Sequence, residues 1–401
     1  MKNVCIFNFW WVSNYGALLT AYAIQSLINK LDYNPLLIDN SYRHNNLISE
    51  NFAKNFEQRY LKTSNKVFLY NDFNNLNKKS NIFITGSDQI LRPIAARERL
   101  TQYLQDFVSI DSKKITMSAS FAVDKKTLLE ETDTQILKNM KISLKSFDFI
   151  SVREKSGVEI CKELFNVDAE WIIDPVFIID KSNYNELIKN STQNFSNKIV
   201  SYVLDPHKEY NKVYKHLEKK YNRKIIKTAY SDISVENWLA SIKNCEFLIT
   251  DSFHGMCFAI IFNKPFICIT NQKRGATRFE SILEMLNIEN QCINNINEIY
   301  EKDCIFKVDY EKVNRRIEEE AQRGLNFLKK ALEAPVGKKD EKMEAKMQFL
   351  ENKVYELEKE ATLKYQIKKE LWNLWLIIFH KYLPSPIKNV IRFVRNCVNR
   401  D

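Results

Sequence analysis

The sequence predicts an α/β protein made of two successive parallel-sheet units followed by a helical tail. Short apolar runs typical of buried strands alternate with amphipathic helices from residue 3 to about residue 290. Five of the seven glycines fall in or near places where such a run gives way to a loop or helix. Glycine is suited to these junctions because the backbone must turn sharply there. After Pro335 the sequence changes to a long, highly charged helical pattern.

The first unit opens with a strand, a helix and a second strand. Residues 3–9 have a buried-strand pattern, residues 17–31 carry apolar side chains at helical spacing, and residues 35–39 (PLLID) predict the next strand. This order implies neighbouring parallel strands. The loop before the helix contains Asn14, Tyr15 and Gly16.

The same strand-to-loop junction recurs along the chain. Strand patterns precede Gly86-Ser87-Asp88-Gln89, Arg153-Glu154, Asp174-Pro175 and Asp251-Ser252-Phe253-His254-Gly255; the patterns are residues 82–85, 147–152, 170–173 and 245–250. Helices are expected at 155–164, 256–262 and 278–286, and further strands at 199–204 and 265–270. The pattern fits two Rossmann-like domains facing a cleft, residues 1–180 and 181–335, with a tail at 336–401.

Composition favours a cytoplasmic globular protein. The chain has 45% hydrophobic and 27% charged residues, and its apolar runs fall short of the roughly 20 residues that span a bilayer. Its N-terminus has no secretory signal pattern. The eight cysteines are scattered without a C-x-x-C pair, so we expect reduced core residues, no disulfide framework and no metal site.

The net charge of +10 favours anionic partners. Nucleic acid, phosphorylated substrates and anionic lipid surfaces all fit the charge alone. No zinc finger, RNA-binding strand motif or long basic arm is present, so we expect no nucleic-acid partner.

The tail contains two distinct patterns. In residues 338–370 a three-four spacing runs through Met343, Met347, Leu350, Val354, Leu357 and Ala361. This spacing predicts either a short coiled coil, and hence a homo-oligomer, or an amphipathic connector. Residues 371–398 combine aromatic, aliphatic and basic side chains. They suit a helix lying peripherally on the inner face of an anionic membrane, or one packed on the protein body.

Three polar residues at strand ends are the candidate catalytic groups, because ligands of open α/β sheets bind there. His254 could donate a hydrogen bond or proton, or cap its helix. Arg153 could hold a carboxylate or phosphate, or form a structural pair with Glu154. Asp88 could orient hydroxyls or act as acid or base, or serve as a helix N-cap.

The loops around these residues supply the candidate substrate-binding groups. Several of the loops precede helices, whose N-termini attract anions. Lys273, Arg274 and Arg278 form a basic group that holds an anion or is a solvated face. The predicted substrate-binding residues are Asn14, Tyr15, Gly16, Ser87, Gln89, Ser252, Gly255, Arg274 and Arg278.

Six short motifs in order resemble the polysaccharide pyruvyl transferase family from about residue 3 to about residue 290. The motifs are Asn14-Tyr15-Gly16-Ala17-Leu18, Gly86-Ser87-Asp88-Gln89, Ser118-Ala119-Ser120-Phe121, Ser151-Val152-Arg153-Glu154, Asp174-Pro175-Val176-Phe177 and Thr250-Asp251-Ser252-Phe253-His254-Gly255. The chain has Leu91 where the family often has an aromatic residue, and Ala122 where it often has glycine. The tail lies outside the resemblance.

The resemblance implies a GT-B-like pair of Rossmann-like domains and pyruvyl transfer from phosphoenolpyruvate. The acceptor would be a sugar of a surface polysaccharide or of its lipid-linked precursor, and the product a pyruvate ketal. By this resemblance Arg153 holds the donor, and His254 binds phosphate or acts as acid. No cofactor or metal is expected. A nucleotide-sugar glycosyltransferase and a non-catalytic scaffold protein of a glycan pathway remain as alternatives.

Overall fold

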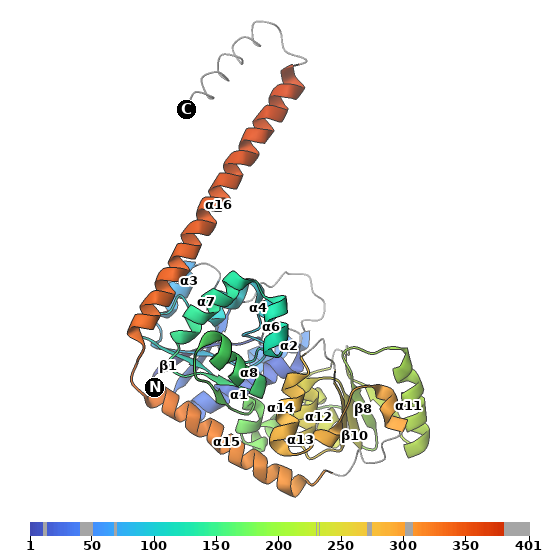
Figure 1. Cartoon of the computed structure of the whole chain (residues 1–401). Helices are drawn as coiled ribbons and strands as arrows, with labels where there is room; N and C mark the ends of the chain where they lie inside the picture. Colours follow the sequence, from blue (N-terminus) through green and yellow to red (C-terminus); the bar gives the residue numbers. More distant parts are fainter. Residues whose placement is uncertain are drawn as a thin grey trace. The chain divides into compact units, whose positions relative to one another are not determined.

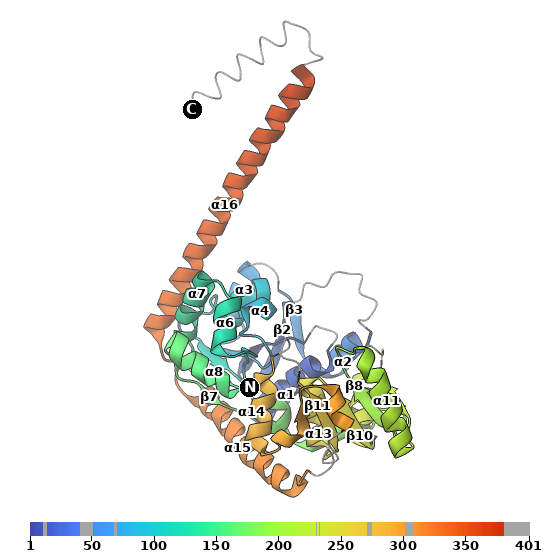
Figure 2. The same cartoon turned by 45° about the vertical axis from the view of Figure 1, so that its right-hand side comes forward.

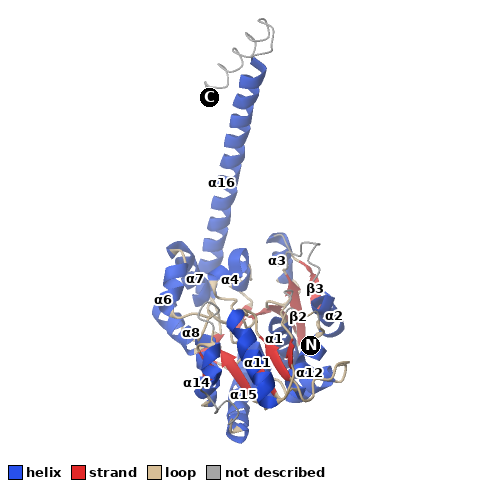
Figure 3. Cartoon of the chain, turned by 90° about the vertical axis from the view of Figure 1, so that its right-hand side faces the viewer, coloured by secondary structure: helices blue, strands red, loops and turns tan. Residues whose placement is uncertain are grey.

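The computed structural model describes residues 1–10, 14–40, 51–67, 70–229, 231, 233–270, 275–300 and 308–380 of the 401 (Figure 1). The chain forms two compact units, Met1–Lys346 and Met347–Asp401. Figure 3 shows the strands of the first unit flanked by helices.

A five-stranded parallel sheet lies at the centre of the N-terminal half. Its spatial order is β3-β2-β1-β4-β5, and every neighbouring pair is parallel. The order reverses between β1 and β4, so the loops after these two strands meet at the point where open α/β sheets bind ligands. The strands are β1 (Asn3–Phe7), β2 (Asn34–Asp39), β3 (Thr63–Lys66), β4 (Ile82–Thr85) and β5 (Lys113–Thr116).

Two short strands, β6 (Ser151–Val152) and β7 (Glu170–Trp171), continue this layer beyond β5. They pair in parallel with each other, and isolated bridges join Ile115 to Phe149 and Ala119 to Val152. The loops after β6 and β7 therefore begin at the same edge of the layer as the loop after β4.

The second sheet is also five-stranded and parallel. Its order is β12-β11-β10-β8-β9, which reverses between β8 and β10. Strands β8 and β10 are buried at every residue, as expected for a sheet covered on both faces. The strands are β8 (Ile199–Tyr202), β9 (Ile225–Lys227), β10 (Phe247–Thr250), β11 (Phe266–Ile269) and β12 (Cys292–Ile293) (Figure 2).

Helices cover both sheets. The longer ones are α1 (Tyr15–Lys30), α2 (Asn51–Tyr60), α7 (Thr134–Lys145), α10 (Lys181–Ile188), α11 (Lys208–Tyr221), α12 (Val235–Asn244), α13 (Phe253–Ile261), α14 (Thr277–Leu286), α15 (Tyr310–Glu333) and α16 (Lys339–His380). The shorter ones are α3 (Tyr70–Leu76), α4 (Pro93–Ala96), α5 (Leu100–Tyr103), α6 (Lys125–Glu131), α8 (Lys155–Ile160) and α9 (Pro175–Ile178). Short 3₁₀ turns span Arg97–Arg99, Glu289–Gln291 and Ile296–Tyr300, and a π turn, Cys161–Phe165, follows α8.

One hydrophobic core joins the two sheets, with Tyr15 at their junction. The Tyr15 ring stacks between Phe52 and Trp238 at centroid distances of 4.5 and 5.1 Å. Its hydroxyl lies 3.0 Å from the carbonyl oxygen of Ser231 and 2.9 Å from that of Ile233. Helix α1 of the first sheet is thus fixed against the second, and both sheets belong to one unit.

The predicted strands and helices are present, with shifted ends. Within 147–152 only Ser151–Val152 is a strand, and the helix expected at 155–164 ends in the π turn. The expected helical tail is α16. The domain limits 1–180 and 181–335 stay a prediction. The six cysteines of the described residues are free and five of them are buried; Cys304 and Cys397 lie outside the described residues.

The start of α16 is held to the first unit by a buried ion pair. The Lys342 Nζ lies 2.7 Å from an Asp148 carboxylate oxygen, and both side chains are almost fully buried. The Gly337 amide donates to the other carboxylate oxygen. The expected basic and aromatic segment 371–398 is helical through His380, and its remainder lies outside the described residues. Within those residues, no helix combines the length and apolarity needed to cross a bilayer.

Candidate functional site

The loop after β4 places Asp88 at the switch point of the first sheet. Glycine at position 86 lets the loop backbone pass close to Asn8, because a Cβ there would lie only 2.9 Å from the Asn8 side-chain oxygen. Asp88 has a φ of 80°, in the left-handed region, and its carboxylate accepts the Gln89 amide at 2.9 Å. Asp88 precedes a turn and caps no helix, so the expected alternative of an N-cap does not apply.

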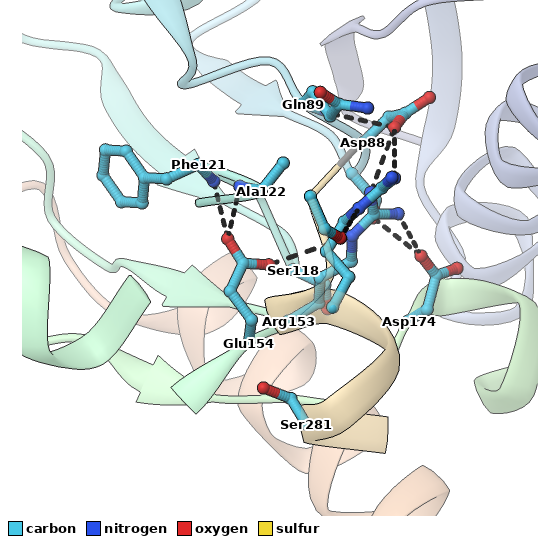
Figure 4. Close-up of polar contacts among 12 residues, drawn as sticks. Asp88, Gln89, Ser118, Phe121, Ala122, Arg153, Glu154, Asp174 and Ser281 are labelled. Atoms are coloured by element: carbon cyan, nitrogen blue, oxygen red, sulfur yellow. Dashed lines mark hydrogen bonds and ion pairs between the residues drawn. The ribbon is translucent and has the colours of Figure 1, made fainter. Parts of the chain in front are cut away.

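Arg153, which follows β6, is the centre of a buried ionic cluster. Its Nη1 donates to Asp174 at 2.7 Å, and its Nη2 donates to Asp88 at 3.0 Å. The Ser87 hydroxyl also donates to Asp174, at 3.0 Å. Figure 4 shows the guanidinium between the two carboxylates. Side chains from the loops after β4 and β7 thus meet at the guanidinium of Arg153, which follows β6.

Glu154 has a different task from its neighbour Arg153. Its Oε1 accepts the backbone amides of Phe121 and Ala122 at 2.6 and 3.0 Å, while its Oε2 lies 4.0 Å from Arg153 Nε without a hydrogen bond. Figure 4 shows the Glu154 carboxylate between the Phe121 and Ala122 amides on one side and the Arg153 side chain on the other. Ala122 has a φ of 63°, which costs a non-glycine residue about 1–2 kcal/mol. Glu154 therefore stabilises a strained loop and also lies at ion-pair distance from Arg153, whose hydrogen bonds go to the aspartates.

His254 enters the site from the second sheet. We expected it in the loop before a helix at 256–262, but α13 begins at Phe253 because the Ser252 hydroxyl accepts the Gly255 amide and caps the helix. His254 lies 5% exposed, with its Nε2 3.0 Å from Thr20 Oγ1 and 3.8 Å from Asp174. A Cβ on Gly16 would overlap its ring.

The contacts of Thr20 define the tautomer of neutral His254. The Thr20 hydroxyl has one proton, and it donates this proton to the Gly16 carbonyl at 2.8 Å. Thr20 Oγ1 is therefore an acceptor toward the imidazole, and the His254 Nε2 must carry the hydrogen in this bond. The same nitrogen lies 3.8 Å from the Asp174 carboxylate.

Two arginine side chains pack against the ring of Phe253. The guanidinium carbons of Arg153 and Arg278 lie 4.5 and 5.4 Å from the ring centroid, typical of cation–π contacts. Arg278, in the first turn of α14, has its Nη1 3.8 Å from Asp88. The aromatic ring thus holds one arginine from each half of the unit beside the same carboxylate.

Burial and charge set the protonation states of the cluster. Burial alone would raise the pKa of Asp88, but the charges of Arg153, His254 and Arg278 outweigh it and lower this pKa to about 2. Burial lowers the pKa of His254 to about 4, with Asp174 and Asp88 opposing the shift. Burial also lowers the pKa of Arg278 to about 10, and Arg153 adds to that shift. Near pH 7 the site combines an ionised Asp88, a neutral imidazole and two guanidinium cations.

The remaining predicted residues occupy supporting positions. Asn14 caps α1 by accepting the Ala17 amide at 3.2 Å, and Tyr15 takes the packing position described above. The Gln89 side chain accepts from Arg92 at 3.3 Å. A Cβ on Gly255 would overlap the Thr250 hydroxyl, so glycine permits close packing there. Arg274 lies outside the described residues.

Three residues of the cluster were not among the predicted site residues. Asp174 appeared only within a motif, although its place after a strand is the same signal that indicated Asp88. Phe253 directly precedes His254. Thr20 lies four residues after Gly16, one helical turn along the same face, but no local pattern connects it to a histidine 234 positions away.

Comparisons with known proteins agree with this architecture. The sequence profile of the polysaccharide pyruvyl transferase family matches residues 14–273. A UDP-GlcNAc 2-epimerase from Neisseria meningitidis, solved with UDP-GlcNAc, is 9% identical and superposes with a TM-score of 0.50 over 88% of this chain and 100% of that one. The S. aureus MnaA–UDP structure is 14% identical, with a TM-score of 0.47 over 83% and 97%. No curated protein sequence matches the chain. The fold is α/β and GT-B-like, as the sequence predicts.

Proposed function

Because the chain belongs to the polysaccharide pyruvyl transferase family, we propose that it transfers a pyruvyl group from phosphoenolpyruvate to a sugar, forming a pyruvate ketal. The acceptor belongs to a surface polysaccharide or to its lipid-linked precursor. The observation that supports this reaction is the convergence of Arg153, Asp88, Arg278 and His254 on one place from both sheets.

The donor carries a carboxylate and a phosphate, and two arginines beside each other suit two anionic groups. Both Nη atoms of Arg153 already donate to aspartates, so this arginine reaches the donor most readily if Asp88 turns away. Arg278 lies 3.8 Å from Asp88 and competes for the same carboxylate. We assign donor binding to Arg278 together with Arg153. A released Asp88 then accepts hydrogen bonds from the sugar hydroxyls.

The ketal forms when two sugar hydroxyls add to C2 of the donor. A proton adds to C3, which makes the C3 methyl group and leaves C2 cation-like; the first hydroxyl oxygen bonds to C2 and loses its proton. The C2–O bond to phosphate then breaks, inorganic phosphate leaves with the bonding electrons, and the second hydroxyl bonds to C2 and loses its proton. Positive charge at C2 is favoured by the nearby Asp88 carboxylate. The pKa of about 2 belongs to Asp88 paired with Arg153, and release from that cation raises this pKa. The released carboxylate therefore orients the hydroxyls and accepts the protons that they lose.

His254 is neutral before the donor arrives, since its pKa is about 4. The negative charge of a bound phosphate raises this pKa, because an anion favours the imidazolium. In this assignment His254 takes up a proton on donor binding and acts as phosphate binder or proton donor. Calorimetry in buffers of different ionisation enthalpy measures the uptake. For a lipid-linked acceptor, the basic and aromatic segment 371–398 places the enzyme at an anionic membrane surface.

Thermal unfolding with added ligand tests the donor assignment. A ligand at 100 times its Kd stabilises the protein by about 2.7 kcal/mol, so we expect phosphoenolpyruvate to raise Tm and a panel of UDP-sugars to leave it unchanged. Arg278→Ala should remove the shift. Arg316→Ala, at a half-exposed arginine of α15, is the matched control and should keep it. A shift with a nucleotide sugar would instead identify a glycosyltransferase, and no shift with phosphoenolpyruvate would contradict the proposal.

A further inference from the structure

Helix α16 carries a stripe of exposed apolar side chains. Met343, Met347, Leu350 and Val354 are 45%, 54%, 42% and 55% exposed and follow each other at steps of four, three and four residues. Ala361, two turns further on, is exposed as well. Large apolar side chains on one face of a charged helix favour association with a covering surface.

The central layer of the stripe, with Val354 at one core position and Leu350 at the other, favours a two-stranded coiled coil. With Met347, Val354 and Ala361 at heptad position a, Met343 and Leu350 take position d. In the sequence Leu357 follows at the next position d. A β-branched residue at a combined with leucine at d favours two strands over three or four.

Charged residues beside the stripe favour a second copy in parallel orientation. Lys346 takes position g, and Glu344, Glu351 and Glu358 take position e. In a parallel pair a residue at g faces position e of the following heptad on the other helix, so Lys346 faces Glu351. The sequence repeats this lysine-to-glutamate step one heptad later, at 353 and 358.

The alternatives place like charges together. An antiparallel pair brings position e opposite position e, so glutamates would face glutamates. An anionic membrane would repel the exposed Glu344, Glu351 and Glu358 that border the stripe. We infer that α16 binds a second copy of this chain through Met343–Ala361 as a parallel two-stranded coiled coil. Because the seam has only about three heptads, the dimer should dissociate on dilution.

The mass of the full-length protein in solution tests the inference. Sedimentation equilibrium across a wide concentration range should give twice the 47.4 kDa of one chain at high concentration and a reversible fall on dilution. Val354→Glu puts a charge at position a and should give single chains at concentrations where the wild type is a dimer. Tyr355→Glu makes the same charge change one residue away, at a side chain that is 67% exposed and points off the seam, and should leave the dimer intact.

Charge exchange tests the orientation. In a parallel dimer Glu351→Lys faces Lys346 on both sides and should raise the dissociation constant severalfold, and Lys346→Glu with Glu351→Lys should restore it. In an antiparallel dimer centred on the seam, position 351 faces position 351 of the other helix, so Glu351→Lys only exchanges one like-charged pair for another, and adding Lys346→Glu would not restore association. A single chain at every concentration, a trimer, equal effects of Val354→Glu and Tyr355→Glu, or failure of Lys346→Glu to restore the association lost in Glu351→Lys would each overturn the inference.

Discussion

The loops after β4 and β10 occupy matching places in the two sheets, yet their aspartates have different partners. Both strands border the reversal of strand order, and they are followed by Asp88 and Asp251. Asp88 accepts from the Arg153 guanidinium at 3.0 Å. Asp251 accepts the backbone amides of Leu204 and Asp205 at 2.6 and 2.9 Å and so ties the loop after β8 to the loop after β10.

The partner of each carboxylate determines its contribution. A carboxylate that satisfies backbone amides fixes a loop and leaves little for a ligand to displace. A carboxylate paired with a side-chain cation is exchangeable, because another anion can take its place. The first half of the unit therefore supplies Asp88, Asp174 and Arg153 of the cluster, and the second half adds the cation of Arg278. The second sheet supplies a fixed frame that positions His254 three residues after Asp251.

The largest expected effect is a loss of folding stability, and it should be greater for Asp174 in the ionic cluster than for Asp251 in the amide-bound loop. Asp174→Ala leaves Arg153 without its fully buried partner, and we expect a loss of about 3–5 kcal/mol in the free energy of unfolding. Asp251→Ala leaves two backbone amides unsatisfied and should cost less, about 1–3 kcal/mol. Urea unfolding of both variants measures the difference. Equal losses would show that the two carboxylates contribute alike.

Stability should depend on pH through His254. Its pKa is about 4 in the folded protein against an ordinary value of 6.5, so the unfolded chain binds more protons between these pH values. The contribution of His254 is complete above pH 6.5 and is lost as pH falls toward 4. The total change is about 3 kcal/mol at most. His254→Gln should flatten this part of the stability profile, and an unchanged profile would exclude His254 as its source.

Two glycines inside helices provide the next test. Gly16→Ala pushes the His254 ring aside and should cost about 1–3 kcal/mol, with transfer activity reduced about a hundredfold through misplacement of the imidazole. Gly324→Ala, in α15, meets the flexible end of Ile178 and should affect stability but not activity. Unfolding and turnover of both variants separate packing from positioning. Full activity of Gly16→Ala would remove His254 from the proposed mechanism.

The sequence allowed the fold to be predicted because alternating strands and helices are a local pattern. It also indicated Asp88, Arg153 and His254, since each lies at the end of a strand-to-loop junction. Arg153 and Asp174 are 21 positions apart and follow different strands, so only the assembled layer brings them together. Tyr15 shows the same dependence on the fold. Its substrate-binding role stays a prediction, and the local sequence gives no sign that its ring stacks on Trp238 of α12, far along the chain.

The smallest expected effect concerns Thr20, whose hydroxyl accepts the His254 Nε2 hydrogen. Thr20→Val keeps the shape and removes the acceptor, so we expect about 1 kcal/mol of lost stability and roughly a tenfold lower turnover. Thr20→Ser keeps the hydroxyl and should retain the wild-type values. Nitrogen NMR of the labelled imidazole should report hydrogen on Nε2 in the wild type and in Thr20→Ser, and a shift toward the Nδ1 form in Thr20→Val. If Thr20→Val leaves the tautomer unchanged, the nearby Asp174 carboxylate orients the ring without Thr20.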